Sequence, residues 1–266
     1  MKTIVITGST RGIGRGLAES FLALGCQVAI AGRNVAAVET AVAALAARYP
    51  GKVVGAAGEI ARATDIEALW ATAHQAFGRV DVWINNAGMS IRRAPLHEAK
   101  TADLEAIIAT NLTGVMLANR IVIAHLLRQG GGQVWNMEGF GSGGQTVPGM
   151  AAYGATKRAL NYLNKALQKE LKDQPVQVCT LSPGIVVTDL LVGDYDASSP
   201  DWPKAKRIFN ILGDTVETVT PWLAQQVLAS NKPGAKVAWL TTGKAFSRFM
   251  TAGFKKRDLF AVASTH

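Results

Sequence analysis

The stretch "KTIVITGSTRGIG", from Lys2 to Gly14, decides the fold. Its first half is short, apolar and β-branched, which is typical of a buried strand. Its second half places Gly8, Gly12 and Gly14 on a turn that opens a helical segment. Glycines at such a turn let the backbone approach a pyrophosphate, and the exposed N–H groups of the helix start favour its negative charge. The stretch predicts a dinucleotide site at the beginning of an α/β sheet.

Six further strand-like runs alternate with segments of helical period. The runs are "CQVAIA", "KVVGAA", "VDVWIN", "GGQVWN", "PVQVCT" and "AKVAWL". Candidate helices lie at about residues 13–24, 34–48, 64–77, 101–129, 151–172 and 215–230. This alternation predicts one doubly wound, Rossmann-type α/β domain over residues 1–266, with a seven-stranded parallel sheet and helices on both faces.

The composition excludes several classes of protein. Of the 266 residues, 48% are hydrophobic and 18% are charged, so the chain can bury a large core. The net charge of +9 calls for an anionic partner, but no nucleic-acid motif occurs and we expect no nucleic acid. The histidines show no ligand spacing, and Cys26 and Cys179 lie in apolar runs, which predicts no metal. Met1 leads straight into a strand and no apolar run approaches the roughly 18 residues of a membrane span, so we expect a cytoplasmic protein.

The end of the second strand predicts which cofactor binds. An NAD enzyme would carry an acid there for the ribose hydroxyls, but the sequence reads "AGRN". Arg33, together with Arg11 inside the glycine turn, offers guanidinium groups suited to a 2′-phosphate. Either arginine alone could be a solvated surface residue, but their setting favours NADP(H).

Tyr153 and Lys157 are the candidate proton donor and its partner. Residues four apart on a helix share one face. An unperturbed tyrosine has a pKa of about 10, and a neighbouring ammonium lowers it by favouring the phenolate. The pair predicts proton delivery to a carbonyl.

Five ordered motifs resemble the short-chain dehydrogenase/reductase family over nearly the whole chain: "TGSTRGIG", "NNAG", "TNLTGV", "YGATK" and "SPGIVVTD". The resemblance implies that Tyr153 donates a proton, Lys157 holds the nicotinamide ribose, and Asn111 supports a lysine-bound water. Asn111 could instead relieve a kinked helix, and Glu59 could be an ordinary exposed strand end. A homodimer or homotetramer through residues 101–129 and 151–172 is expected by the same analogy. The implied cofactor residues are Gly8, Ser9, Thr10, Arg11, Gly12, Ile13, Gly14, Arg33, Asn34, Glu59, Ile60, Asn86, Ala87, Gly88, Tyr153, Lys157, Pro183, Gly184, Ile185 and Thr188.

One family residue is missing. The usual serine thirteen residues before the tyrosine is Phe140 here, and counting from the strand end at Asn136 gives Gly139. Ser142, flanked by glycines, is the candidate donor to the carbonyl, with loop filler as the alternative.

One subgroup of the family has a similar stretch in place of the usual serine. "NMEGFGSGG" before "YGATK", and the later "SPGIVVTDLL", "RIFNILGDTVETVTPWL" and "WLTTGKAF", resemble plant-type chlorophyll b reductases. The resemblance implies NADPH-dependent reduction of the 7-formyl group of chlorophyll b or its dephytylated form, with Ser142 or a protonated Glu138 contacting the carbonyl. The alternatives are a generic NADPH carbonyl reductase for a ketone or 3-oxoacyl thioester, and a non-catalytic NADP-sensing scaffold.

Two later segments suggest contacts with a large apolar substrate. Residues 188–215 would form a substrate lid carrying Tyr195, Trp202 and Phe209, although core packing explains these side chains nearly as well. Residues 243–260 interleave basic and aromatic residues, which predicts peripheral contact with a membrane or pigment protein. A solvated C-terminal cap is the alternative for that segment.

Overall fold

The structure is a computed structural model that describes residues 1–193, 202–253 and 257–260. The sheet has seven parallel strands in the order β3-β2-β1-β4-β5-β6-β7, so the predicted fold class is confirmed. Each of the seven strand-like runs forms one strand. The strands are β1 (Thr3–Ile6), β2 (Gln27–Gly32), β3 (Val53–Ala57), β4 (Val82–Asn85), β5 (Gly132–Met137), β6 (Val176–Ser182) and β7 (Lys236–Ala238).

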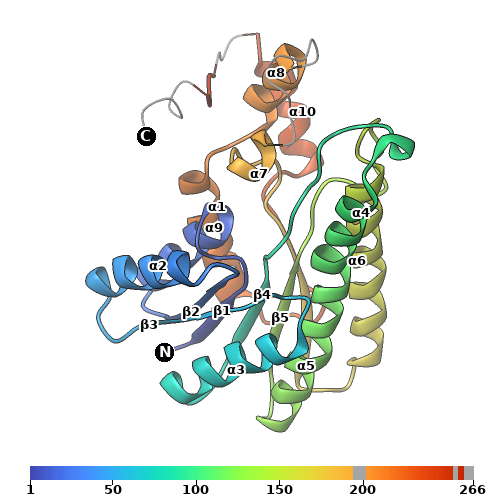
Figure 1. Cartoon of the computed structure of the whole chain (residues 1–266). Helices are drawn as coiled ribbons and strands as arrows, with labels where there is room; N and C mark the ends of the chain where they lie inside the picture. Colours follow the sequence, from blue (N-terminus) through green and yellow to red (C-terminus); the bar gives the residue numbers. More distant parts are fainter. Residues whose placement is uncertain (194–201, 254–256, 261–266) are drawn as a thin grey trace.

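Helices cover both faces of this sheet (Figure 1). Successive strand residues point to opposite faces, so Ile4 and Ile6 of β1 pack in one core cluster and Val5 packs in the other. One face is covered by α1 (Gly12–Ala23), α2 (Val35–Arg48) and α9 (Val216–Ala229). The other is covered by α3 (Ala63–Phe77), α5 (Gly114–Arg128) and α6 (Ala151–Glu170).

The long helix expected at 101–129 is interrupted near its middle. It consists of α4 (Thr101–Ile108), a π-helical turn η2 (Ala109–Thr113) and α5. Among the described residues, the helix Thr101–Arg128 is long and apolar enough to cross a membrane by length and composition. Its α5 part packs against the sheet in the buried core. A buried core helix can have the same length and apolar composition as a membrane-spanning helix. The π turn places Asn111 where the helix changes course.

Short elements gather beyond the carboxyl ends of the strands (Figure 1). They are η1 (Leu96–Glu98), α7 (Asp189–Val192), α8 (Trp202–Leu212) and α10 (Thr242–Thr251). The expected lid therefore contains α7 and α8, while Tyr195 lies outside the described residues.

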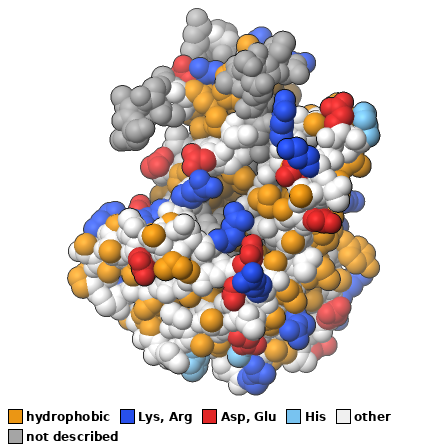
Figure 2. Space-filling model, in the orientation of Figure 1, with side chains coloured by type: hydrophobic (Ala, Val, Ile, Leu, Met, Phe, Trp, Pro, Cys, Tyr) orange, Lys and Arg blue, Asp and Glu red, His pale blue; other side chains and the backbone are white. Residues whose placement is uncertain are grey.

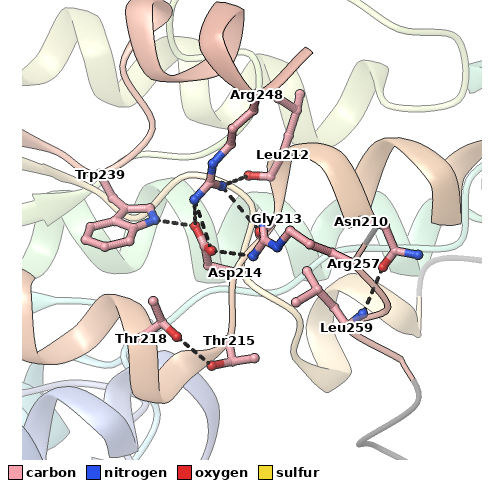
Figure 3. Close-up of polar contacts among 10 residues, drawn as sticks. All are labelled: Asn210, Leu212, Gly213, Asp214, Thr215, Thr218, Trp239, Arg248, Arg257 and Leu259. Carbon is pink, nitrogen blue, oxygen red and sulfur yellow. Dashed lines mark hydrogen bonds and ion pairs between the residues drawn. The ribbon is translucent and has the colours of Figure 1, made fainter. Parts of the chain in front are cut away.

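The buried carboxylate of Asp214 ties the end of α8 to α10 (Figure 3). It accepts a hydrogen bond from Trp239 Nε1 at 2.6 Å and pairs with Arg248 at 2.8 Å and Arg257 at 2.7 Å. Burial by itself raises the pKa of Asp214, but the hydrogen bonds from these three side chains outweigh it and hold that pKa below its ordinary value. Arg248 also donates to Leu212 O at 2.8 Å.

The C-terminal basic and aromatic residues therefore have different roles. Arg248 and Arg257 form internal ion pairs rather than a solvated cationic face. Phe246, Phe249 and Met250 share one side of α10 and are 68%, 49% and 66% exposed. Lys255 and Lys256 lie outside the described residues.

Candidate active site

The strand order reverses between β1 and β4, and such a switch point opens a crevice at the carboxyl edge of the sheet. The turns after these two strands touch there. A Cβ on Gly8 would stand 2.8 Å from Ala87 Cα, and the φ of 62° at Gly8 also requires glycine. Asn86 Nδ2 donates to Thr7 O and Gly8 O at 2.9 Å each. These contacts fix the glycine turn next to the end of β4.

A cleft of about 1330 Å³ opens at this point. Figure 2 shows a hollow beneath the upper helices, with charged side chains of both signs at its rim. The cleft contains nearly all of the expected cofactor residues. They are Gly8, Thr10, Arg11, Gly12, Ile13, Gly14, Arg33, Asn34, Glu59, Ile60, Asn86, Ala87, Gly88, Tyr153, Lys157, Pro183, Gly184, Ile185 and Thr188.

Ser9 is the one expected cofactor residue outside the cleft lining. Its side chain is fully buried, donating to Ile6 O at 2.6 Å and accepting from Ala31 N at 2.9 Å. The placement of Ser9 among the cofactor residues is corrected for its side chain, because these bonds direct the hydroxyl into the protein. Ser9 joins the glycine turn to β2 instead.

Lys157 and Tyr153 lie on the same side of α6, at the cleft. Lys157 is only 5% exposed, and its Nζ donates to Met137 O at 3.2 Å and stands 5.7 Å from the centre of the Tyr153 ring. Desolvation lowers the pKa of Lys157 to about 8, although the negative charge of Glu138 works to raise it. The lysine is therefore mainly a cation at neutral pH, close enough to favour the ionised form of the tyrosine.

Asn111 lies in the same corner but behind the cleft wall. It is fully buried, and its side chain accepts from Met89 N and donates to Met89 O, each at 2.8 Å. A Cβ on Gly88 would meet Asn111 Oδ1 at 3.5 Å and Lys157 Nζ at 3.8 Å. Asn111 thus anchors the loop after β4 from the π-helical turn, and its part in a proton relay stays a prediction.

The structure does not bring Ser142 into the cleft. Its hydroxyl is buried, accepts from Gly139 N at 3.1 Å and donates to Gly139 O at 2.8 Å. The expected carbonyl contact is corrected for this conformation, because both bonds of the hydroxyl close the turn after β5. Ser142 holds Gly139 in place rather than facing a substrate.

Gly139 lies directly against Tyr153 and Lys157. A Cβ there would lie 3.2 Å from Tyr153 Cζ and from Lys157 Cε, and closer still to Tyr153 Oη. The tyrosine hydroxyl therefore lies in space that a side chain at this position would need. A side chain at position 139 would therefore displace the hydroxyl of Tyr153 or the end of Lys157.

Glu138 is also committed elsewhere. Its carboxylate is buried, lies 2.7 Å from Lys236 Nζ and accepts from Asn161 Nδ2 at 3.1 Å. Because these contacts engage the carboxylate, the suggestion that Glu138 polarises the carbonyl is corrected. Its remaining influence on the site is the electrostatic one on Lys157.

The opposite end of the cleft fits a phosphorylated dinucleotide. Arg11 and Arg33 are exposed at its wall, and Arg11 makes a 3.3 Å ion pair with Asp189, which is equally exposed. Glu59 N donates to Asp65 Oδ2 at 2.8 Å, which is the main reason that the pKa of Asp65 is below its ordinary value. Glycine backbone and a helix start are parts that hold a pyrophosphate.

Sequence reasoning missed several lining residues, because they lie in loops or near helix starts outside any motif. The main ones are Asp65, Arg92, Arg93, Val147, Met150 and Lys204.

Hydride exchange with a carbonyl needs a dinucleotide and a proton donor beside it, and this cleft fits both requirements. The protein is a nicotinamide-dependent oxidoreductase. It belongs to the short chain dehydrogenase family, whose model matches residues 2–197.

The chloroplastic chlorophyll(ide) b reductase NOL of Arabidopsis thaliana is 38% identical over 257 residues, which cover 93% of this chain and 72% of that protein. The structure is similar to a 3-ketoacyl-(acyl-carrier-protein) reductase of Brucella melitensis complexed with NADH, with 25% identity, a TM-score of 0.77 and coverage of 90% of this chain and 96% of that one. A gluconate 5-dehydrogenase of Burkholderia cenocepacia in complex with NADP and tartrate has 28% identity and a TM-score of 0.76, covering 92% and 95%.

These comparisons overturn one expectation and remove one alternative. The chlorophyll(ide) b reductases of Arabidopsis and rice are chloroplastic, which contradicts the expected cytoplasmic location. A non-catalytic sensor is not supported, because the chain belongs to an oxidoreductase family and presents Tyr153 and Lys157 at the cleft.

Proposed function

We propose that this protein uses NADPH to reduce the 7-formyl group of chlorophyll(ide) b to a hydroxymethyl group. The observation that carries the proposal is the size of the cleft beside Tyr153. Its volume of about 1330 Å³ exceeds the roughly 300–1,000 Å³ of ordinary ligand pockets, which leaves room for a large flat ring system next to a dinucleotide. The similarity to reductases of this pigment supports the same substrate.

The residues of the chain have separate tasks in this reaction. A nicotinamide held at this cleft would supply the hydride for the formyl carbon. Tyr153 hydrogen-bonds the carbonyl oxygen and gives it the proton, and the phenolate that remains is stabilised by the Lys157 cation. Asn111 supports the return of a proton through Lys157, and Gly139 leaves the space that the tyrosine hydroxyl occupies. In the absence of a serine, Tyr153 itself supplies the hydrogen bond to the carbonyl.

NADP is the cofactor that the cleft favours. Arg33 stands at the end of β2, where the ribose of the adenosine half would lie, and Arg11 projects from the glycine turn. Two guanidinium groups without an acid at the strand end suit a 2′-phosphate.

Purified protein with NADPH and detergent-dispersed chlorophyllide b provides the test. The expected result is loss of the absorption of the formyl pigment together with NADPH oxidation, abolished in Tyr153→Phe, which still binds NADPH. Unchanged pigment in the presence of active protein would contradict the proposal.

A generic carbonyl reductase for 3-oxoacyl thioesters is the second candidate. The likeness to the Brucella ketoacyl reductase over 90% of the chain favours it. Turnover of a 3-oxoacyl thioester but not of the pigment would select this candidate, so both substrates belong in the same assay.

Exposed apolar residues support a proposal for the assembly of the protein. We propose a homodimer or homotetramer through α4, α5 and α6, where Ile108, Met116 and Tyr162 are 48%, 49% and 77% exposed.

We also propose that the chain is one domain whose lid contains α7 and α8. The exposed face of α10 is proposed to make peripheral contact with membrane or pigment protein.

A further inference from the structure

The substrate end of the cleft has a charge pattern that the hydride-transfer reaction does not use. Arg92 and Arg93 belong to the loop between β4 and α4 and line the cleft, as does Lys204 of α8. The arginines also line a small cavity together with Met150 and Tyr153. They therefore lie on the tyrosine side of the cleft, away from the glycine turn.

Packing between two loops holds these arginines at that position. A Cβ on Gly149 would stand 3.3 Å from Arg93 Cβ and 3.4 Å from Ala94 N, so the loop after β4 rests against the loop before α6. The φ of 79° at Gly149 requires glycine at this contact. The contact fixes the backbone at Arg93, next to Arg92, and both arginines line the small cavity that also includes Tyr153.

Two acids that line the cleft are already engaged. Glu138 pairs with Lys236 at 2.7 Å, and Asp189 pairs with Arg11 of the glycine turn at 3.3 Å. Within residues 1–193, 202–253 and 257–260, neither Arg92 nor Lys204 makes an ion pair. Arg92 and Lys204 are therefore two cleft-lining cations that no carboxylate pairs with in the part of the chain that the structure describes.

We infer that this end of the cleft binds a carboxylate of the substrate, with Arg92 as its main contact and Lys204 as a second cation. A guanidinium matches a carboxylate through two parallel hydrogen bonds, whereas an ester offers no charge to match. If the proposed function holds, the preferred substrate is the dephytylated pigment, whose propionate is free, rather than the esterified pigment. On the macrocycle, the ring that carries this propionate is opposite the ring that carries the formyl group, so one end can be held while the other reacts.

The test compares chlorophyllide b with its propionate methyl ester, which keeps the ring system and removes only the charge. Wild type should show a kcat/KM about tenfold higher for the free acid, the size expected of one charge-assisted hydrogen bond. Arg92→Gln should bring the ratio of the two kcat/KM values close to one, and Lys204→Gln should lower it less. Arg48→Gln, an exposed arginine of α2 outside the cleft, is the matched control and should keep the wild-type ratio.

Equal kcat/KM for acid and ester in wild type would overturn the inference while leaving the proposed function intact. If Arg92→Gln keeps the wild-type ratio of kcat/KM for acid and ester, Arg92 is not the main contact of the carboxylate. If wild type reduces neither pigment, the proposed function fails instead, and quenching of pigment fluorescence still compares the affinities for acid and ester. Equal affinities, or no binding of either pigment, would then overturn the inference as well.

Discussion

Restoring the side chain that the family usually carries before its tyrosine should damage this enzyme. In Gly139→Ala the new Cβ would lie 3.2 Å from Tyr153 Cζ and Lys157 Cε, whereas carbon atoms prefer about 3.5–4.0 Å. Both side chains must therefore move by roughly 0.3–0.8 Å, and the closer tyrosine hydroxyl by about 1 Å. A misplacement of about 1 Å costs on the order of 100-fold in rate, or about 2.7 kcal/mol. Gly139→Ser should be at least as slow.

Steady-state reduction of chlorophyllide b, with thermal melting as the check on folding, measures this effect. The backbone at Gly139 is not left-handed, so alanine is compatible with the fold and the melting temperature should change little. Gly154→Ala on α6 is the matched control, because no atom lies within 4 Å of its new Cβ and turnover should be kept. Wild-type kcat in Gly139→Ala or Gly139→Ser would refute the steric reasoning and reopen a role for a hydroxyl at that position.

Four further predictions follow from the contacts around the cleft. Ser142→Ala should lower the free energy of unfolding by about 1–3 kcal/mol in a denaturant titration, because Gly139 loses its side-chain partner; a fall in kcat without loss of stability would return Ser142 to the chemistry. In a pH profile of kcat/KM, reduction should decline above about pH 8 as Lys157 loses its proton. Glu138→Gln removes the charge that raises the pKa of Lys157 and should move this decline to lower pH, whereas Lys236→Gln should not; a decline that stays in place or moves upward contradicts the assignment. Arg33→Ala should raise the KM for NADPH about 10-fold or more and leave the KM for NADH unchanged, and equal changes for both cofactors would argue against a 2′-phosphate contact. Asp214→Asn should cost about 2–3 kcal/mol of unfolding free energy, less than a fully buried pair because Arg248 and Arg257 are partly exposed. Since the folded-state pKa of Asp214 is below its ordinary value, this difference should be complete above that value and disappear as the pH falls through the folded-state pKa; a difference that persists in acid would contradict the ion-pair account.

The fold could be predicted because its signals are local. Each strand is a short apolar run with a clear boundary, and the glycine turn identifies the first strand and helix together. The π-helical turn at Ala109–Thr113 gave no comparable signal, because its sequence keeps the helical period of α4 and α5. Asn111 of this turn bonds to Met89, which is distant in sequence, so the contact could not be read from a local pattern.

The site was predictable only as far as its motifs reached. Tyr153, Lys157 and the glycine turn have fixed spacings, so their meeting at one cleft followed from topology. The direction of a hydroxyl in a glycine-rich turn cannot be read from spacing, and Ser142 points to Gly139 rather than into the cleft. Arg92 and Lys204 come from a loop and a helix that converge only in three dimensions, so no sequence pattern identified them.

The most direct test of the central claim follows the hydride itself. Wild type would be incubated with chlorophyllide b and NADPH that carries deuterium at both C4 positions, and the pigment would be analysed by mass spectrometry. The account predicts a 7-hydroxymethyl product that contains one deuterium on the former formyl carbon, and none of this product with Tyr153→Phe. Recovery of the formyl pigment without label, while a 3-oxoacyl thioester gains deuterium under the same conditions, would contradict it.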